Sequence, residues 1–113
     1  MTHQDVFDSS IRSKGDMAGV FEYDGDSGYF YLFDTKNVQG HQVVGAIRIL
    51  IGEADVNEAD ISIRWDSLET RVGLFIQGQL IAAFDIEQAA QYGGAYHENC
   101  GRAIPLEVLK AFE

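Results

Sequence analysis

From Met17 onward, apolar residues occur in short runs separated by turn residues. Runs of this length, bounded by Gly, Asp, Asn and Ser, are typical of strands in an antiparallel meander. The pattern predicts about six strands, near residues 17–23, 29–34, 41–51, 61–66, 71–76 and 79–84. The run Tyr29-Phe30-Tyr31-Leu32-Phe33 places aromatic residues on both faces of a strand, which favours a central strand.

Strict alternation between residues 61 and 66 gives one strand an apolar and a polar face. A four-residue turn at 67–70 places Ile63 opposite Leu74, and a two-residue hairpin loop at Gln77-Gly78 places Leu74 opposite Ile81. In this register the predicted core face holds Ile61, Ile63, Trp65, Val72, Leu74, Ile76, Ile81 and Ala83. The opposite face holds Ser62, Arg64, Asp66, Arg71, Gly73, Phe75, Leu80, Ala82 and Phe84.

Two short helices are expected to cover the apolar end of that second face. Asp85-Ile86-Glu87-Gln88 resembles a capping box, and Gly93 suits the residue beyond a helix end. Pro105 fits the first turn of a helix at the C-terminus. The predicted fold class is therefore a β-rich α+β domain: an antiparallel meander sheet of about six strands with two short helices.

Residues 1–15 are polar and lack a steady period, so a loosely ordered N-terminal arm is expected there, which Val6, Phe7 and Ile11 could anchor. Residues 16–113 contain no repeats, low-complexity tracts or Pro-rich linkers and are predicted to form a single globular domain.

Charge narrows the choice of partner. Eighteen acidic and eight basic residues give the 113-residue chain a formal net charge of −10. This charge repels phosphate backbones and anionic membrane surfaces, so neither nucleic acid nor membrane is expected as a partner. It favours association with a basic protein, although the same charge also serves solubility.

The single Cys100 and the absence of a signal-peptide pattern predict a cytoplasmic protein. The oligomeric state is left open.

Several stretches resemble a family of small uncharacterised bacterial proteins, a domain of unknown function. The resemblance rests on a D-G-x-x-G-Y-F-Y motif at residues 24–31 with Asp34 after it, and on the strand Ile63-Arg64-Trp65. It continues through residues 73–78 and Ala83-Phe84-Asp85 to Tyr92, and covers about residues 16–100. It implies a fold and no activity.

Catalytic and metal-binding patterns are incomplete. The acidic turn at residues 22–26 begins like a calcium loop, but Gly28, Tyr29 and Thr35 stand where further ligands and the sharp-turn glycine belong. His97 and Cys100 supply half of a zinc site, or a base beside a thiol, without a third partner. No metal, no cofactor and no catalytic residue is therefore predicted.

Two groups of residues are candidate binding sites. Arg64, Asp66 and Arg71 share the polar sheet face, where Gly73 opposite Arg64 would leave open space for an anion or a partner carboxylate. An ion pair between Asp66 and Arg71 that merely completes the surface is the simpler interpretation. Tyr96, His97 and Cys100 lie on a Gly-flanked loop.

The leading functional hypothesis is a non-catalytic, acidic protein-binding module that neutralises or regulates a basic partner. The alternative is a small-ligand-binding protein or an enzyme that uses the Tyr96–Cys100 loop.

Overall fold

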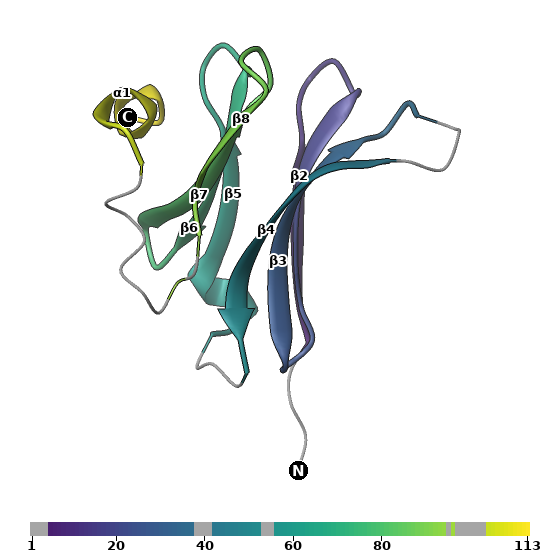
Figure 1. Cartoon of the computed structure of the whole chain (residues 1–113), viewed down its shortest axis with the longest axis vertical. Coiled ribbons are helices and arrows are strands. Elements are labelled where there is room, and N and C mark those ends of the chain that lie inside the picture. The colour runs from purple at the N-terminus through teal and green to yellow at the C-terminus, as the bar shows by residue number, and fades with distance from the viewer. Residues whose placement is uncertain (1–4, 38–41, 53–55, 95, 97–103) are drawn as a thin grey trace.

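Two four-stranded antiparallel sheets pack face to face in the computed structural model, which describes residues 5–37, 42–52, 56–94, 96 and 104–113 (Figure 1). The first sheet contains, in spatial order, β1 (Val6–Ile11), β2 (Met17–Tyr23), β3 (Ser27–Asp34) and β4 (Val43–Ile51). The second contains β5 (Ile61–Trp65), β6 (Arg71–Ile76), β7 (Gln79–Asp85) and β8 (Ala90–Gly93). A 3₁₀ turn, η1 (Glu58–Asp60), precedes β5, and α1 (Leu106–Ala111) lies near the C-terminus.

The mostly β, antiparallel character of the prediction is confirmed, but a single six-stranded sheet with two helices is wrong. β4 pairs with β3 and β5 pairs with β6, so the chain changes sheets between Ile51 and Ile61. The described residues 5–15 also differ from a loose arm, because β1 pairs with β2 from Val6 to Ile11 and Val6 is buried. Alternation identifies the two faces of each strand but not the strand beside it, and it could not reveal this division.

The expected helix after residue 85 is instead a β-turn between β7 and β8. The Asp85 carboxylate accepts the N–H of Gln88 at 3.0 Å, as a helix cap would, but Ala89 adopts a positive φ of 52° and the chain reverses. Gly93, expected beyond a helix end, is the last residue of β8. An Asp side chain that accepts from a following N–H begins turns as readily as helices.

The core lies between the two sheets. Phe21, Phe30, Ile49 and Leu50 of the first sheet are fully buried against Val72, Leu74 and Ile76 of the second. The Phe30 and Phe84 rings, one from each sheet, lie 5.1 Å apart between centroids. The sheets approach closely at Gly19, where an added Cβ would lie 2.8 Å from Val72 Cγ2. Large side chains from both inner faces therefore interdigitate, as in other β-sandwiches.

The hairpin at Gln77-Gly78 is confirmed, and both residues have positive φ, 52° and 81°. Ile63 lies opposite Leu74 as predicted, but Leu74 lies opposite Ala82 and not Ile81. A β-bulge at Ile81 inserts one residue into β7, and this insertion exchanges the faces of the residues beyond it. Phe84 therefore lies in the core between the sheets, whereas Ala83 faces outward.

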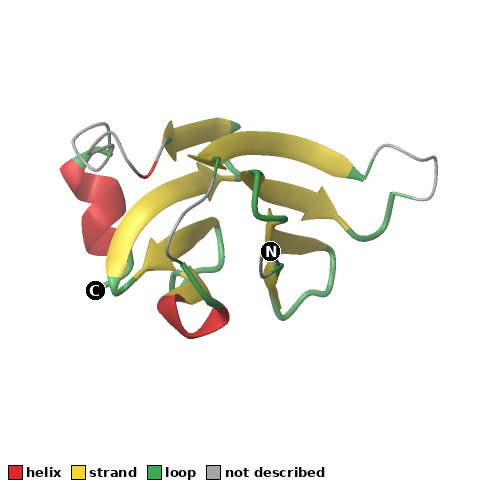
Figure 2. Cartoon of the chain, turned by 90° about the horizontal axis from the view of Figure 1, so that it is seen from below, coloured by secondary structure: helices red, strands yellow, loops and turns green. Residues whose placement is uncertain are grey.

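Helix α1 covers the outer face of the second sheet, as predicted for the C-terminal helix. Val108 is buried against Phe75, Leu80 and Ala83, and the Phe112 ring meets the Phe75 ring edge-on at 5.6 Å. Figure 2 shows the helix to one side of the strongly curved strands. A second, smaller core thus lies between the outer face of the second sheet and α1.

An ion pair fixes the β1–β2 connection. The Arg12 guanidinium donates two hydrogen bonds to the Asp16 carboxylate, at 2.7 and 2.8 Å, and a third to the backbone oxygen of Glu69 at 2.8 Å. Ser13 donates its N–H and its hydroxyl to the Glu69 carboxylate. These bonds join a turn of the first sheet to a turn of the second.

The hydrogen bonds from Arg12 lower the pKa of Asp16 from 3.8 to about 2. The ion pair should therefore contribute stability above pH 4 and lose this contribution as the pH falls from about 4 to about 2. In a ¹³C NMR titration, Arg12→Gln should return the Asp16 midpoint toward 3.8. Lys14→Gln, which removes only the smallest of the contributions to this pKa, should leave it near 2. An Asp16 midpoint near 3.8 in the wild-type protein would contradict the ion pair.

Candidate functional site

Asp66 and Arg71, two of the residues singled out from sequence, belong to a buried charge network. The Asp66 carboxylate accepts the N–H groups of Thr70 and Arg71 at 3.0 and 3.1 Å. The Arg71 guanidinium lies 3.8 Å from Asp66 Oδ2 and donates to Asp85 Oδ2 at 3.0 Å. Both carboxylates are nearly inaccessible, so this network joins two turns of the second sheet and presents little charge to solvent.

Arg64 points away from this network. Its guanidinium carbon lies 4.1 Å from the centroid of the Phe75 ring, a cation–π contact on the outer face of the second sheet. The open space predicted above Gly73 is absent, because an added Cβ there would lie 2.7 Å from Leu80 Cδ1 and 3.0 Å from Phe112. Sequence analysis expected helices over the apolar end of this face only, so it left the space above Gly73 open. Arg64 is thus exposed, and the side chains of Leu80 and Phe112 occupy the space above Gly73 that an anion would have needed.

The third group is only partly described. Tyr96 is half-buried and packs against the core between the sheets. His97 and Cys100 lie outside the described residues.

The outer face of the first sheet differs from that of the second because no described element covers it. In Figure 1, α1 lies against the β5–β8 side, whereas the far side of β1–β4 is bare in the described part of the chain. Large apolar side chains are consequently left in solvent: Phe7 is 54% exposed and Ile11 is 56% exposed. Contiguous exposed apolar surface of this kind marks interaction sites in soluble proteins.

Two depressions adjoin on this face. An open groove of about 650 Å³ is lined mainly by Phe7, Ile11, Ala18, Val20, Phe33 and Val43. A pocket of about 340 Å³ lies beside it, with Glu22, Asp24, Tyr29 and Tyr31 in its lining. Phe7, Glu22 and Tyr31 line both, so the pocket and the groove form one continuous surface on the first sheet. This surface is called the outer face below, and the corresponding side of the second sheet is always named with its sheet.

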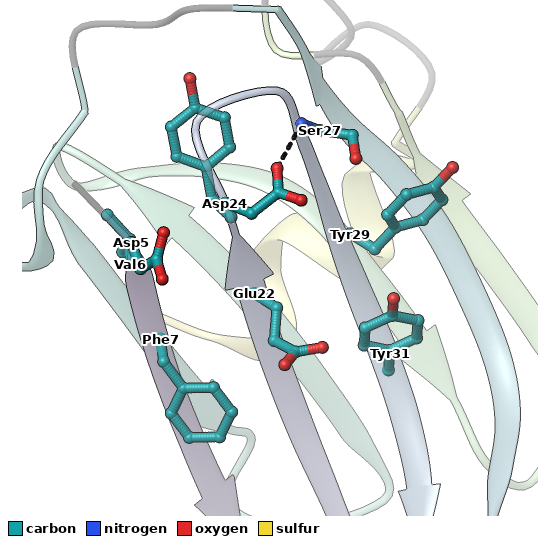
Figure 3. A pocket seen from close by; sticks show the side chains of 9 residues that line it. Asp5, Val6, Phe7, Glu22, Asp24, Ser27, Tyr29 and Tyr31 are labelled. Atoms are coloured by element: carbon teal, nitrogen blue, oxygen red, sulfur yellow. Dashed lines mark hydrogen bonds between the residues drawn. The ribbon is translucent and has the colours of Figure 1, made fainter. Parts of the chain in front are cut away.

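The strands position the pocket side chains by alternation. Glu22 on β2 lies opposite Tyr29 on β3, and Tyr31 follows two residues later on the same face. The two tyrosine rings stack at 5.8 Å with an angle of 15° between their planes. Figure 3 shows the Glu22 carboxylate between the Phe7 and Tyr31 rings, and the Asp24 side chain turned to the N–H of Ser27.

Electrostatically the pocket is acidic with one cation at its edge. Glu22 is exposed, and within the described ranges no hydrogen bond or ion pair engages its carboxylate. Burial, and then the nearby charge of Glu22, raises the pKa of Tyr31. Arg48 on β4 donates to the Tyr29 hydroxyl at 3.2 Å, and its guanidinium carbon lies 5.8 Å from the centroid of that ring. It is the one basic residue on strands β1–β4.

Sequence analysis missed the outer face, although two signals point to it. Phe7, Ser9 and Ile11 alternate along β1, and Tyr29, Tyr31 and Phe33 alternate along β3. The first pattern lay in residues expected to be loosely ordered, and the second was assigned to a central strand because of its aromatic residues on both faces. β3 does lie between two other strands, but only one of its faces is covered by described residues.

No three His, Cys, Asp or Glu side chains come together as a metal site within the described ranges. None of the helices in the described part of the chain has the length and apolar character needed to cross a bilayer.

The fold and the outer face define a small antiparallel β-sandwich with one aromatic sheet face that no described residue covers. The chain belongs to a bacterial family: the family model described as "Uncharacterized protein conserved in bacteria (DUF2251)" matches residues 1–99, which confirms the resemblance noted from its motifs. No curated protein and no solved structure matches the chain.

Proposed function

We propose that this protein is a non-catalytic binding module that binds a basic partner protein through the outer face of its first sheet. The observation that supports the proposal best is the exposure of Phe7 and Ile11 on the face that also carries Glu22, a carboxylate that no described residue pairs. The pocket and groove together offer a recess to a folded surface or an extended segment.

The aromatic composition supports a protein partner. Interfaces between proteins are enriched in Tyr and Phe at their centres and poor in charged residues there. The outer face carries Phe7 on β1 and Tyr29, Tyr31 and Phe33 on β3, with Glu22 of β2 between the two strands. The equivalent face of the second sheet is covered by the chain's own α1. A partner would cover the first sheet as α1 covers the second.

Charge complementarity supports a basic partner over a second copy of the same chain. Two copies joined through this face would bring two Glu22 side chains and two net charges of −10 together. Repulsion of this kind opposes association, whereas a positively charged partner would be attracted over about 8 Å at physiological ionic strength. Phosphate-rich nucleic acids would be repelled like a second copy.

Selection from a display library of random twelve-residue peptides tests the proposal. Peptides that bind the immobilised protein should be enriched in Arg or Lys together with an apolar residue. Their affinity should fall as salt is raised from 50 to about 500 mM, because screening weakens the electrostatic attraction. Phe7→Ser should weaken binding by about tenfold or more, the effect of losing one central aromatic contact.

Leu68→Ser is the matched control, because Leu68 is 78% exposed in a turn of the second sheet. It should bind like the wild-type protein. Neutral or acidic selected peptides, or equal binding by the Phe7→Ser and Leu68→Ser variants, would refute the proposal.

A further inference from the structure

We infer that the outer face recognises its partner at two adjoining places: the pocket receives an arginine side chain, and the groove receives an apolar side chain of the same segment. This inference rests on the proposed function and specifies the chemistry of the partner.

One tyrosine of the pocket, Tyr29, already binds a guanidinium. Arg48 lies over the ring of Tyr29 and donates to its hydroxyl at 3.2 Å. Tyr31 stacks beside Tyr29, on a strand flanked on its other side by Glu22 of β2. Planar guanidinium groups favour aromatic faces and carboxylates together, and the pocket offers both.

Glu22 distinguishes between occupants of the pocket. An apolar side chain placed over Tyr31 would cover the Glu22 carboxylate without supplying a hydrogen-bond donor, and burying an unpaired charge is costly. An acidic side chain would be repelled by Glu22 and by Asp24 in the same lining. A cationic side chain satisfies the carboxylate and stacks on the ring at the same time.

The groove beside the pocket has a different character. Ala18, Val20 and Phe33 in its lining carry no charge, and Glu22 enters only where the groove meets the pocket. Glu22, the carboxylate that the arginine would pair, lies opposite Tyr29, and Phe33 in the groove is four residues beyond Tyr29 on β3, or about 13 Å at the usual rise of a strand. An extended partner segment would therefore place its arginine and its apolar side chain about four residues apart.

A defined peptide probe tests this arrangement by NMR titration of the full chain. The probe is a Gly/Ser peptide with one arginine and one leucine four residues apart, made in both orders, the tighter-binding order being used. Replacing its arginine by citrulline, which has the same shape without the charge, should weaken binding to the wild-type protein by about 5- to 10-fold at low salt. Glu22→Gln should reduce this ratio to about one. Glu107→Gln, on α1 across the molecule, should leave it unchanged.

The outcomes separate the inference from the proposed function. Equal affinity of the arginine and citrulline peptides, with loss of binding when leucine becomes alanine, would overturn the arginine pocket and retain the binding face. No shift of outer-face resonances with any peptide would overturn both. Dimerisation of the protein alone, with shifts at Phe7 and Tyr31, would overturn both in favour of a second copy as the occupant.

Discussion

Replacing Phe30 by alanine should lower the free energy of unfolding by about 3–5 kcal/mol. Phe30 has no exposed surface and packs against Phe84, so its ring joins the inner faces of both sheets. Truncation removes this contact and leaves a cavity that the backbones of two sheets cannot easily close. Chemical denaturation followed by tryptophan fluorescence measures the loss, because Trp65 packs against the same core.

Phe7→Ala is the matched control, since it makes the same change in a side chain that is 54% exposed. It should cost less than about 1 kcal/mol. If Phe30→Ala cost as little as Phe7→Ala, the two sheets would not share the core described above.

Arg71→Met should destabilise the protein by about 3 kcal/mol. Arg71 is the counter-charge of two carboxylates, Asp66 and Asp85, whose residues are only 6% and 4% exposed. Methionine retains much of the side-chain volume but leaves two buried carboxylates without their cation, which costs more than the packing it preserves. Urea unfolding at pH 7 gives the value.

Arg48→Met provides the comparison for Arg71→Met, because Arg48 is exposed and makes its hydrogen bond and its cation–π contact with the Tyr29 side chain. Its loss should cost less than about 1 kcal/mol. A similar small value for Arg71→Met would show that the Asp66–Arg71–Asp85 network contributes little to folding.

The positions of most strands could be predicted from sequence, because period-two alternation and Gly/Asp turns are local signals. Met17–Tyr23 is predicted to the residue, and the turn at 67–70 and the hairpin at Gln77-Gly78 are correctly placed. The division into two sheets depends on which strands pair, and pairing is a long-range property that alternation does not encode. The bulge at Ile81 left no local signal and exchanged Ala83 for Phe84 in the core.

Candidate binding residues were harder to predict, for a physical reason. Sequence analysis favours charged and nucleophilic residues, and two of those chosen, Asp66 and Arg71, neutralise each other inside the fold. Exposed apolar residues on a strand have the same pattern as core residues, so Phe7, Ile11 and Val43 could be recognised only once the covering elements were known. With α1 over the second sheet, no described element covers the outer face of the first sheet.

The most direct test of the central claim locates the bound partner on the protein. A selected basic peptide carrying a nitroxide spin label would be added to the isotopically labelled full chain, and paramagnetic broadening of its NMR signals recorded. The account predicts broadening at Phe7, Val20, Tyr31 and Phe33, and sharp signals at Arg64, Phe75 and Val108. Broadening confined to α1 or to Tyr96 and its loop would contradict it, and would favour a site on the opposite sheet or the Tyr96–Cys100 loop instead.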